Sequence, residues 1–205
     1  MITEGGNNNS LYPRREDSVR IRRFLDWKPF DPIVKQLCAD LRTIGVEAHY
    51  VENPDRQGRE IDITRSPIHW INMTFSISDS PPDTVEYCIP DSRHIPRINL
   101  HSKEIKTRPL LGRTIDIRWQ GDDKGTGIAK LLSSDGSIKN TIMNTCEVTV
   151  KGDPQHACWL IIYERWRSLS ITSQQWRCYE KIAESLLATP LKPLISSNFP
   201  SMGGV

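Results

Sequence analysis

The stretch with the most suggestive chemistry is a glycine- and aspartate-rich loop, Gly121-Asp-Asp-Lys-Gly-Thr-Gly127, which stands just before a segment of helical pattern. Backbone amides at the start of a helix can bind phosphate, and paired carboxylates can bind a divalent cation. A phosphate-binding P-loop, however, needs a lysine directly after its second glycine. Here Lys124 precedes Gly125, and Asp122 and Asp123 would repel phosphate. We interpret the loop as a solvated turn and keep a metal- or phosphate-dependent enzyme as an alternative function.

A second group of carboxylates lies near a predicted hairpin, where Glu60 and Asp62 alternate along a strand. Further on, Glu104-Ile105-Lys106 has the acid-x-lysine form of metal-dependent nucleases, in which acids on neighbouring strands hold the Mg²⁺ that activates water. The long gap between Asp62 and Glu104 argues against such a site, and alternating acids are typical of the solvent face of a strand. Glu60 and Asp62 therefore remain candidate site residues only for the alternative function, a metal- or phosphate-dependent enzyme.

The five cysteines, at positions 38, 88, 146, 158 and 178, include no Cys-x-x-Cys pair. Structural zinc sites usually use such close pairs, so His156 and Cys158 with Cys146 and Cys178 make a poor metal site. A nucleophilic Cys–His pair stays open, because its members meet in space rather than in sequence. The odd count, without an export signal, favours reduced thiols in a cytoplasmic protein. We expect no bound metal and no cofactor, and we assign no catalytic residue.

The strongest candidate for binding is a basic segment with five arginines within ten residues: Arg14, Arg15, Arg20, Arg22 and Arg23. Aromatic residues are interleaved with it, so phosphate pairing and base stacking make a nucleic-acid-binding protein a second alternative. Glu16, Asp17 and Asp26 offset part of the local charge. We therefore expect a protein partner or a second copy of the chain, with nucleic acid as the alternative. Trp166, flanked by two arginines, is a further candidate contact, because exposed tryptophans are typical of interface hot spots.

Composition sets few limits on function. The chain has 205 residues and a formal net charge of +2, which is too small by itself to indicate a polyanionic partner. No apolar run approaches the ~18 residues of a membrane helix, so we expect a soluble protein without a membrane span.

The pattern of apolar residues predicts an α+β fold, a largely antiparallel sheet of six to eight strands with two main helices packed on one face. Asp31-Pro32 begins a helix to residue 44, and the capping-box pair Thr172 and Gln175 begins another at 173–188. Four strands in a row indicate an antiparallel meander, at 46–51, 60–64, 68–77 and 84–89. The pattern in residues 114–163 predicts a strand, two short helices and a hairpin. We expect these elements to form a compact half-domain on which the rest of the chain packs.

These elements suggest a flexible arm at 1–13, one α+β domain at 14–189 and a tail at 190–205. Prolines and mixed charge predict an irregular connection at 90–113, a second candidate contact surface. We therefore expect a non-catalytic binding or assembly protein that acts through the arginine-rich arm and this connection. The predicted core consists of six large apolar residues: Phe75, Ile117, Trp159, Ile161, Ile182 and Leu186.

Overall fold

The computed structural model describes residues 31–51, 59–74, 84–108, 112–144, 147–163 and 171–191. The chain divides into two units, Met1–Pro32 and Ile33–Val205, and the fold below belongs to the second apart from the first two residues of its first helix. The predicted boundary between residues 13 and 14 lies outside the described part, as does most of the tail. The described helices are α2 (Asp31–Thr43), α3 (Ile128–Ser134), α4 (Gly136–Asn144) and α5 (Ser173–Ala188).

Eight strands form one sheet in which every described pair of neighbours is antiparallel. Their order is β1-β2-β3-β4-β8-β7-β5-β6, which confirms the predicted fold class and the meander of the first four strands. The strands are β1 (Glu47–Tyr50), β2 (Arg59–Thr64), β3 (Trp70–Thr74), β4 (Thr84–Pro90), β5 (Asn99–Lys106), β6 (Thr114–Asp122), β7 (Val148–Asp153) and β8 (Cys158–Tyr163).

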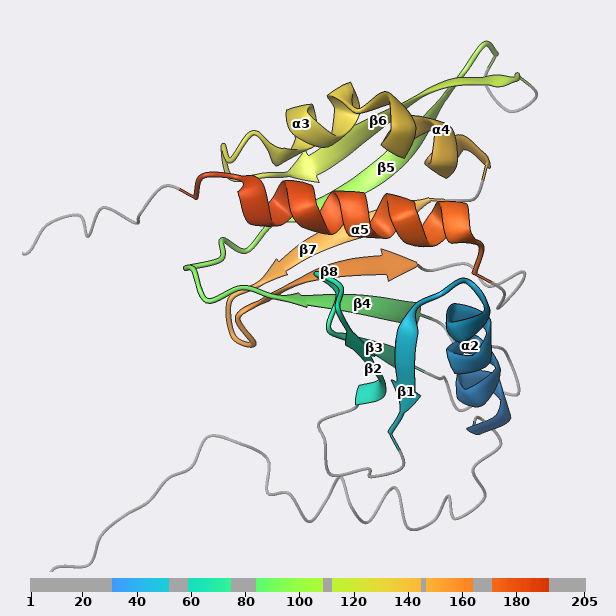
Figure 1. Cartoon of the computed structure of the whole chain (residues 1–205). Helices are drawn as coiled ribbons and strands as arrows, with labels where there is room; N and C mark the ends of the chain where they lie inside the picture. Colours follow the sequence, from blue (N-terminus) through green and yellow to red (C-terminus); the bar gives the residue numbers. More distant parts are fainter. Residues whose placement is uncertain are drawn as a thin grey trace, which may run out of the picture. The chain divides into compact units, whose positions relative to one another are not determined.

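The helices cover one face of this sheet (Figure 1). Helix α5 crosses in front of β7 and β8, α3 and α4 lie over β6 at one edge, and α2 lies beside β1 at the other. Helix α5 begins as predicted, because the side chain of Thr172 accepts a hydrogen bond from the Gln175 amide while the Gln175 side chain accepts one from the Thr172 amide. This reciprocal cap fixes where the helix that crosses the centre of the sheet starts.

The prediction of an irregular connection at 90–113 is wrong, because β5 occupies residues 99–106 of it. This strand lacks the apolar alternation that marks its neighbours. Its inward side chains are Leu100, Ser102 and the half-buried Glu104, and the buried Ser102 hydroxyl accepts a 2.8 Å hydrogen bond from the Val148 amide. Strand β5 also inserts between β6 and β7, so residues 114–163 do not form a half-domain of their own.

A single core lies between the sheet and the helices. Five of the six predicted core residues are at most 1% exposed there, and the sixth, Phe75, lies outside the described residues. Strand β8, predicted to be central, lies between β4 and β7. The predicted apolar face of β6 is only partly buried, because Ile117 and Trp119 face the core while Ile115 is 57% exposed.

At each edge of the open sheet, a side chain from the adjacent helix is hydrogen-bonded to a backbone group of the edge strand. On β1, the Arg42 guanidinium of α2 donates a 2.7 Å hydrogen bond to the carbonyl of Ala48. On β6, the Trp119 amide donates a 3.1 Å bond to the Ser133 hydroxyl of α3, and the Ile117 amide donates to the carboxylate of Asp116. Edge groups satisfied in this way are not available for pairing with another strand.

An ion pair between a buried carboxylate and a half-buried guanidinium joins the sheet to the end of α5. The carboxylate of Asp91, just after β4, accepts hydrogen bonds from the Trp159 indole (2.9 Å) and from the Arg93 guanidinium (2.6 to 3.0 Å). Arg93 also donates to the carbonyls of Thr189 (2.7 Å) and Leu186 (3.1 Å). Burial alone would raise the pKa of Asp91, but the hydrogen bonds from Arg93 and Trp159 outweigh it and lower that pKa. The pair thus satisfies carbonyls left over at the helix C-terminus.

Truncation of the core should be costly at β8. We expect Ile161→Ala to lower the free energy of unfolding by about 2–5 kcal/mol, because the fully buried side chain leaves a cavity. Ile115→Ala, at a 57% exposed position, is the control and should cost less than about 1 kcal/mol. Urea denaturation checks both, and equal losses for the two variants would contradict the described core.

Loss of the guanidinium from the buried pair should also destabilise the fold. We expect Arg93→Met to cost about 3 kcal/mol at neutral pH, because it leaves the Asp91 carboxylate buried without its countercharge. Arg97→Met, on the same connection but exposed, is the control. The difference between the variants should shrink as the pH falls, because the lowered pKa of Asp91 means that its stabilisation is lost on acidification. A loss for Arg93→Met that matches the control would contradict the role of the pair.

Candidate functional site

The sequence-predicted binding residues lie outside the described residues. These are Arg14, Arg15, Arg20, Arg22, Arg23 and Trp166. Their expected role therefore stays a prediction, and the structure bears on the other candidates: the glycine-rich loop, the acids of β2 and β5, the cysteines, and residues 90–113.

The loop between β6 and α3 uses its acids and glycines for its own geometry. The carboxylate of Asp122 accepts a hydrogen bond from the Lys124 amide (3.2 Å), and that of Asp123 accepts one from the Gly125 amide (2.8 Å). At Gly121 a Cβ atom would lie 2.1 Å from the Asn99 carbonyl oxygen, so close packing on β5 requires glycine. The loop amides that would have to bind a phosphate thus already donate to carboxylates, which agrees with the interpretation as a turn.

The acids of the nuclease-like hypothesis are not brought together. Strands β2 and β5 are separated by four other strands, which places Glu60 and Asp62 roughly 24 Å from Glu104 across the sheet. Glu104 forms a 2.9 Å ion pair with Lys106. Asp62 lines a surface hollow of about 800 Å³ with His69, Trp70 and His156. Within the described ranges, however, no group of three or more His, Cys, Asp or Glu side chains is arranged to hold a metal ion.

Of the cysteines in the suggested cluster, Cys146 lies outside the described residues, and Cys158 and Cys178 lie on different elements. Cys178, on α5, donates a weak hydrogen bond to the Ile138 carbonyl of α4, whereas Cys158 begins β8. The ring of His156 is hydrogen-bonded to Asp153 at 2.6 Å and not to a thiol. Burial raises the pKa of both thiols to about 11, with Asp153 and Glu86 adding to the effect at Cys158. A nucleophilic cysteine needs a lowered pKa, so neither thiol suits that role.

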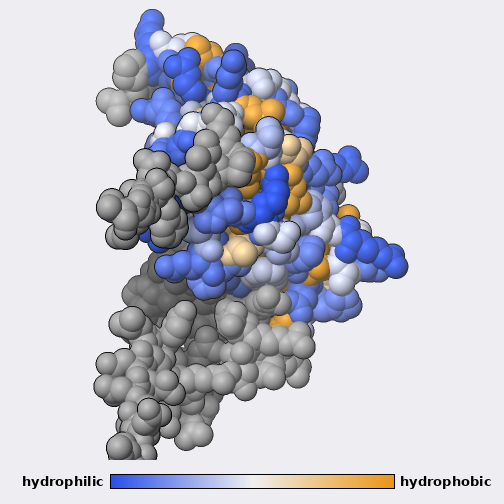
Figure 2. Space-filling model, turned by 90° about the vertical axis from the view of Figure 1, so that its left-hand side faces the viewer, coloured by the Kyte–Doolittle hydropathy of each residue, from blue (hydrophilic) through white to orange (hydrophobic). Residues whose placement is uncertain are grey.

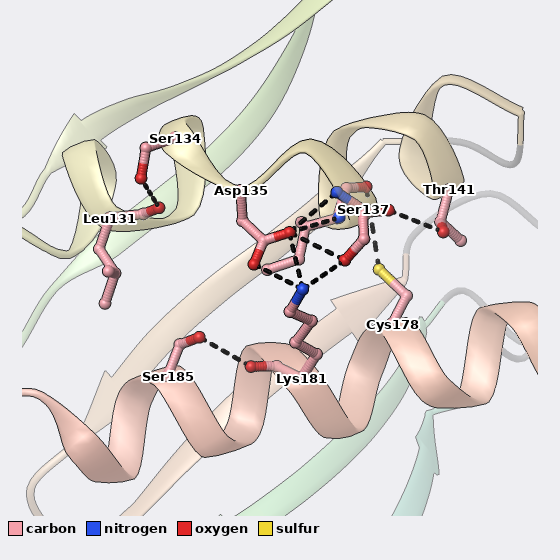
Figure 3. A network of polar contacts seen from close by, with 9 residues as sticks. Leu131, Ser134, Asp135, Ser137, Thr141, Cys178, Lys181 and Ser185 are labelled. Carbon is pink, nitrogen blue, oxygen red and sulfur yellow. Dashed lines mark hydrogen bonds and ion pairs between the residues drawn. The ribbon is translucent and has the colours of Figure 1, made fainter.

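A polar cluster that the sequence did not suggest joins α4 to α5 (Figure 3). Asp135, between α3 and α4, accepts hydrogen bonds from the amides of Ser137 (2.9 Å) and Ile138 (3.1 Å) and so caps α4. From α5, the ammonium of Lys181 reaches both Asp135 (2.8 Å) and the Ser137 hydroxyl (2.6 Å). The signal for the cap was present in the sequence as Asp135 ahead of Gly136, but nothing in it placed Lys181 there.

A serine hydroxyl beside a lysine is the arrangement of a Ser–Lys nucleophile, in which the amine removes the hydroxyl proton. Here Lys181 is ion-paired with Asp135, and an ammonium in an ion pair has no lone pair for that proton. Partial burial alone would raise the pKa of Asp135, but the bonds from Lys181, Ser137 and the two amides lower it to about 2. The cluster is therefore suited to holding α4 on α5 and not to catalysis.

The β5–β6 hairpin extends beyond the rest of the sheet as a two-stranded ribbon. Strand β5 pairs with β6 from Asn99 to Lys106 but with β7 only from Asn99 to His101. Lys103 and Arg118 stand directly opposite each other in the ribbon. Like charges in opposite positions are destabilising, so the fold itself does not account for this pair.

The ribbon carries cations whose charge is not offset. Its exposed basic residues without an ion-pair partner among the described residues are Lys103, Arg108, Arg113 and Arg118. The acids of the two strands are engaged with other lysines: Glu104 with Lys106, Asp116 with Lys139 and Asp122 with Lys124. We name these four cations the basic ribbon. It is the strongest feature of the described chain that packing does not explain.

The chain matches no protein-family model, no curated protein and no solved structure. Among the described helices, none is both long and apolar enough to cross a membrane. The function has to be inferred from the chemistry of the chain itself.

The Asp135 cluster predicts a specific loss of acid resistance. We expect Lys181→Met to cost about 1–2 kcal/mol at neutral pH, because it removes a charged hydrogen-bond donor from a partly buried carboxylate. With a folded pKa of about 2 and an ordinary value of 3.8, Asp135 stabilises the fold above about pH 4, and the contribution disappears as the pH falls to 2. The variant should therefore approach the wild type in stability over that interval. Lys139→Met, which removes the partner of the more exposed carboxylate Asp116, is the control. A constant difference between Lys181→Met and the wild type down to pH 2 would contradict the assignment.

Proposed function

We propose that this chain is a non-catalytic binding or assembly protein. Its two contact surfaces are the arginine-rich segment at residues 14–23 and the segment at 90–113, whose exposed part is the basic ribbon. For the arginine-rich segment the proposed partner is a protein or a second copy of the chain, with Trp166 as a further contact. We also infer a cytoplasmic setting, which the odd cysteine count supports.

The observation that carries the proposal is the basic ribbon. Four exposed cations, two of them directly opposite each other, lie on a hairpin that extends past the neighbouring strand. Such an arrangement costs stability in the isolated fold. A partner that supplies negative charge would remove this cost, which makes 90–113 a contact surface despite its regular structure.

The side chains with reactive groups support the non-catalytic part of the proposal. The carboxylates of the Gly121–Gly127 loop cap the loop itself, and the Ser137–Lys181 pair is held by Asp135. Two thiols have a pKa of about 11. In each case the group has a structural partner or a protonation state that opposes catalysis.

The surface favours polar contacts over strand addition or a large apolar interface. At each sheet edge one backbone group is already bonded to a helix side chain, the Ala48 carbonyl to Arg42 and the Trp119 amide to Ser133. On the part of the molecule that Figure 2 shows in colour, hydrophilic residues predominate and apolar residues form small, separate patches. Large contiguous apolar patches are the usual sign of an obligate interface.

Removal of residues 1–23 tests the proposal directly. We expect the shortened chain to keep the circular dichroism and cooperative unfolding of the full chain, because the described core contains none of these residues. Assembly should be lost, as measured by sedimentation velocity of the full and shortened chains and by cross-linking to the partner that co-purifies from the native cell. Replacing the five arginines by lysine is the matched control, since it keeps the charge and removes the bidentate guanidinium.

The outcomes separate three cases. Loss of assembly with an intact fold supports the proposal. Unfolding of the shortened chain would mean that the segment is structural, and unchanged assembly would mean that it is no contact surface. Either of the last two results removes the arginine-rich segment from the proposed function.

A further inference from the structure

We propose that the basic ribbon binds the sugar–phosphate backbone of a nucleic acid duplex. This inference rests on the proposed non-catalytic binding function and names the partner of its 90–113 surface. It differs from nucleic-acid binding through Arg14–Arg23, because the cations belong to a different part of the chain, the β5–β6 hairpin.

The charges of the ribbon suit a polyanion. Lys103, Arg108, Arg113 and Arg118 are exposed and make no ion pair with a described residue, while the acids of the same two strands are held by lysines. Each cation that contacts a phosphate releases a condensed counterion, which is the main source of sequence-independent affinity for a duplex. Four such contacts predict weak to moderate binding that depends strongly on salt.

The shape of the ribbon suits a duplex groove. Two antiparallel strands lie about 4.8 Å apart, and the major groove of B-DNA, about 12 Å wide, admits a two-stranded ribbon. Strand β5 covers roughly 10 Å from Lys103 to Lys106, and Arg108 lies in the bend that follows, so the cations are spread along the hairpin and can meet more than one phosphate of a backbone. The ribbon is free of β7 over this length, since the β5–β7 ladder ends at His101.

Other polyanions fit the ribbon less well. Single strands are bound largely by stacking on aromatic rings, and the aromatic residue among the described ones of the ribbon, Trp119, is 4% exposed. Acidic proteins usually add apolar or aromatic anchors to their charges. Among the residues of the ribbon that the structure describes, one large apolar side chain, Ile115, is exposed. Phosphate contacts need only the cations, so a duplex is the better partner.

The test uses the full chain and fluorescent duplexes of mixed sequence, about two helical turns long, as DNA and as RNA. Anisotropy titrations from about 50 to 200 mM NaCl should give a slope of log affinity against log salt near −3.6, which is about a 150-fold loss over that range. The double variants Arg108→Gln with Arg113→Gln, and Lys103→Gln with Arg118→Gln, should each reduce the slope by about 2. The double variant Lys130→Gln with Arg177→Gln, at exposed positions on α3 and α5, changes the net charge equally and should bind as the wild type does.

Several results would overturn the inference: no binding at the lowest salt, equal loss in the control, or equal binding of poly-glutamate. Binding that survives the ribbon substitutions but is lost on deletion of residues 1–23 would assign nucleic acid to the arm instead. Since assembly is measured separately, failure of this inference leaves the proposed protein contact of the arm standing. Unequal affinity for the DNA and RNA duplexes would tell which of the two the ribbon fits.

Discussion

The ion pair of Asp91 and Arg93 is the contact on which the arrangement of sheet and helix depends. It lies where β4 leaves the sheet, binds the indole of Trp159 on the central strand β8, and reaches two carbonyls at the end of α5. The capping box at Thr172 fixes the start of the same helix. Helix α5 is thus held at both ends by polar groups, while its apolar face supplies the burial in between. The polar contacts at its two ends thus determine where α5 lies on the sheet, and the burial of its apolar face supplies most of the stability. This division is expected, because a buried charge pair carries little net stability of its own.

Elements with a strong local signal could be predicted, and those held by distant partners could not. The capping box, the Asp31-Pro32 start and the alternation in β3 and β6 are short-range patterns that the structure retains. Strand β5 was missed because one inward position, Ser102, is polar and is satisfied by the Val148 amide of a strand far along the chain. Its insertion between β6 and β7 also broke up the predicted half-domain. Asp91 and Arg93 carried no periodic signal, since Asp91 binds Trp159 of β8, 68 residues away, and Arg93 binds carbonyls at the end of α5, more than 90 residues away.

The candidate functional residues follow the same rule: local patterns could be predicted from the sequence, and contacts between distant residues could not. The sequence placed the acids of the Gly121–Gly127 loop in a turn, and the described hydrogen bonds agree with it. It could not foresee the Ser137–Lys181 contact, which joins residues 44 positions apart, nor the opposition of Lys103 and Arg118, which depends on strand register. Register brings these two cations together although the chain as a whole is almost neutral. Net charge was therefore a poor guide to local charge, because paired lysines cancel the acids of the ribbon and leave its other cations exposed.

The edge contacts of Arg42 and Ser133 bear on when, during folding, the chain can associate with other chains through its sheet edges. Arg42 and Ser133 reach the edge strands only when α2 and α3 are docked. A sheet that forms before these helices pack presents bare amides and carbonyls on both sides, and antiparallel pairing between distant strands is slow. Protection of these edge groups against association therefore requires docked helices, and it is lost if a helix detaches. Association through these edges thus depends on how long the helices stay undocked, and the stability of the finished sheet does not measure it.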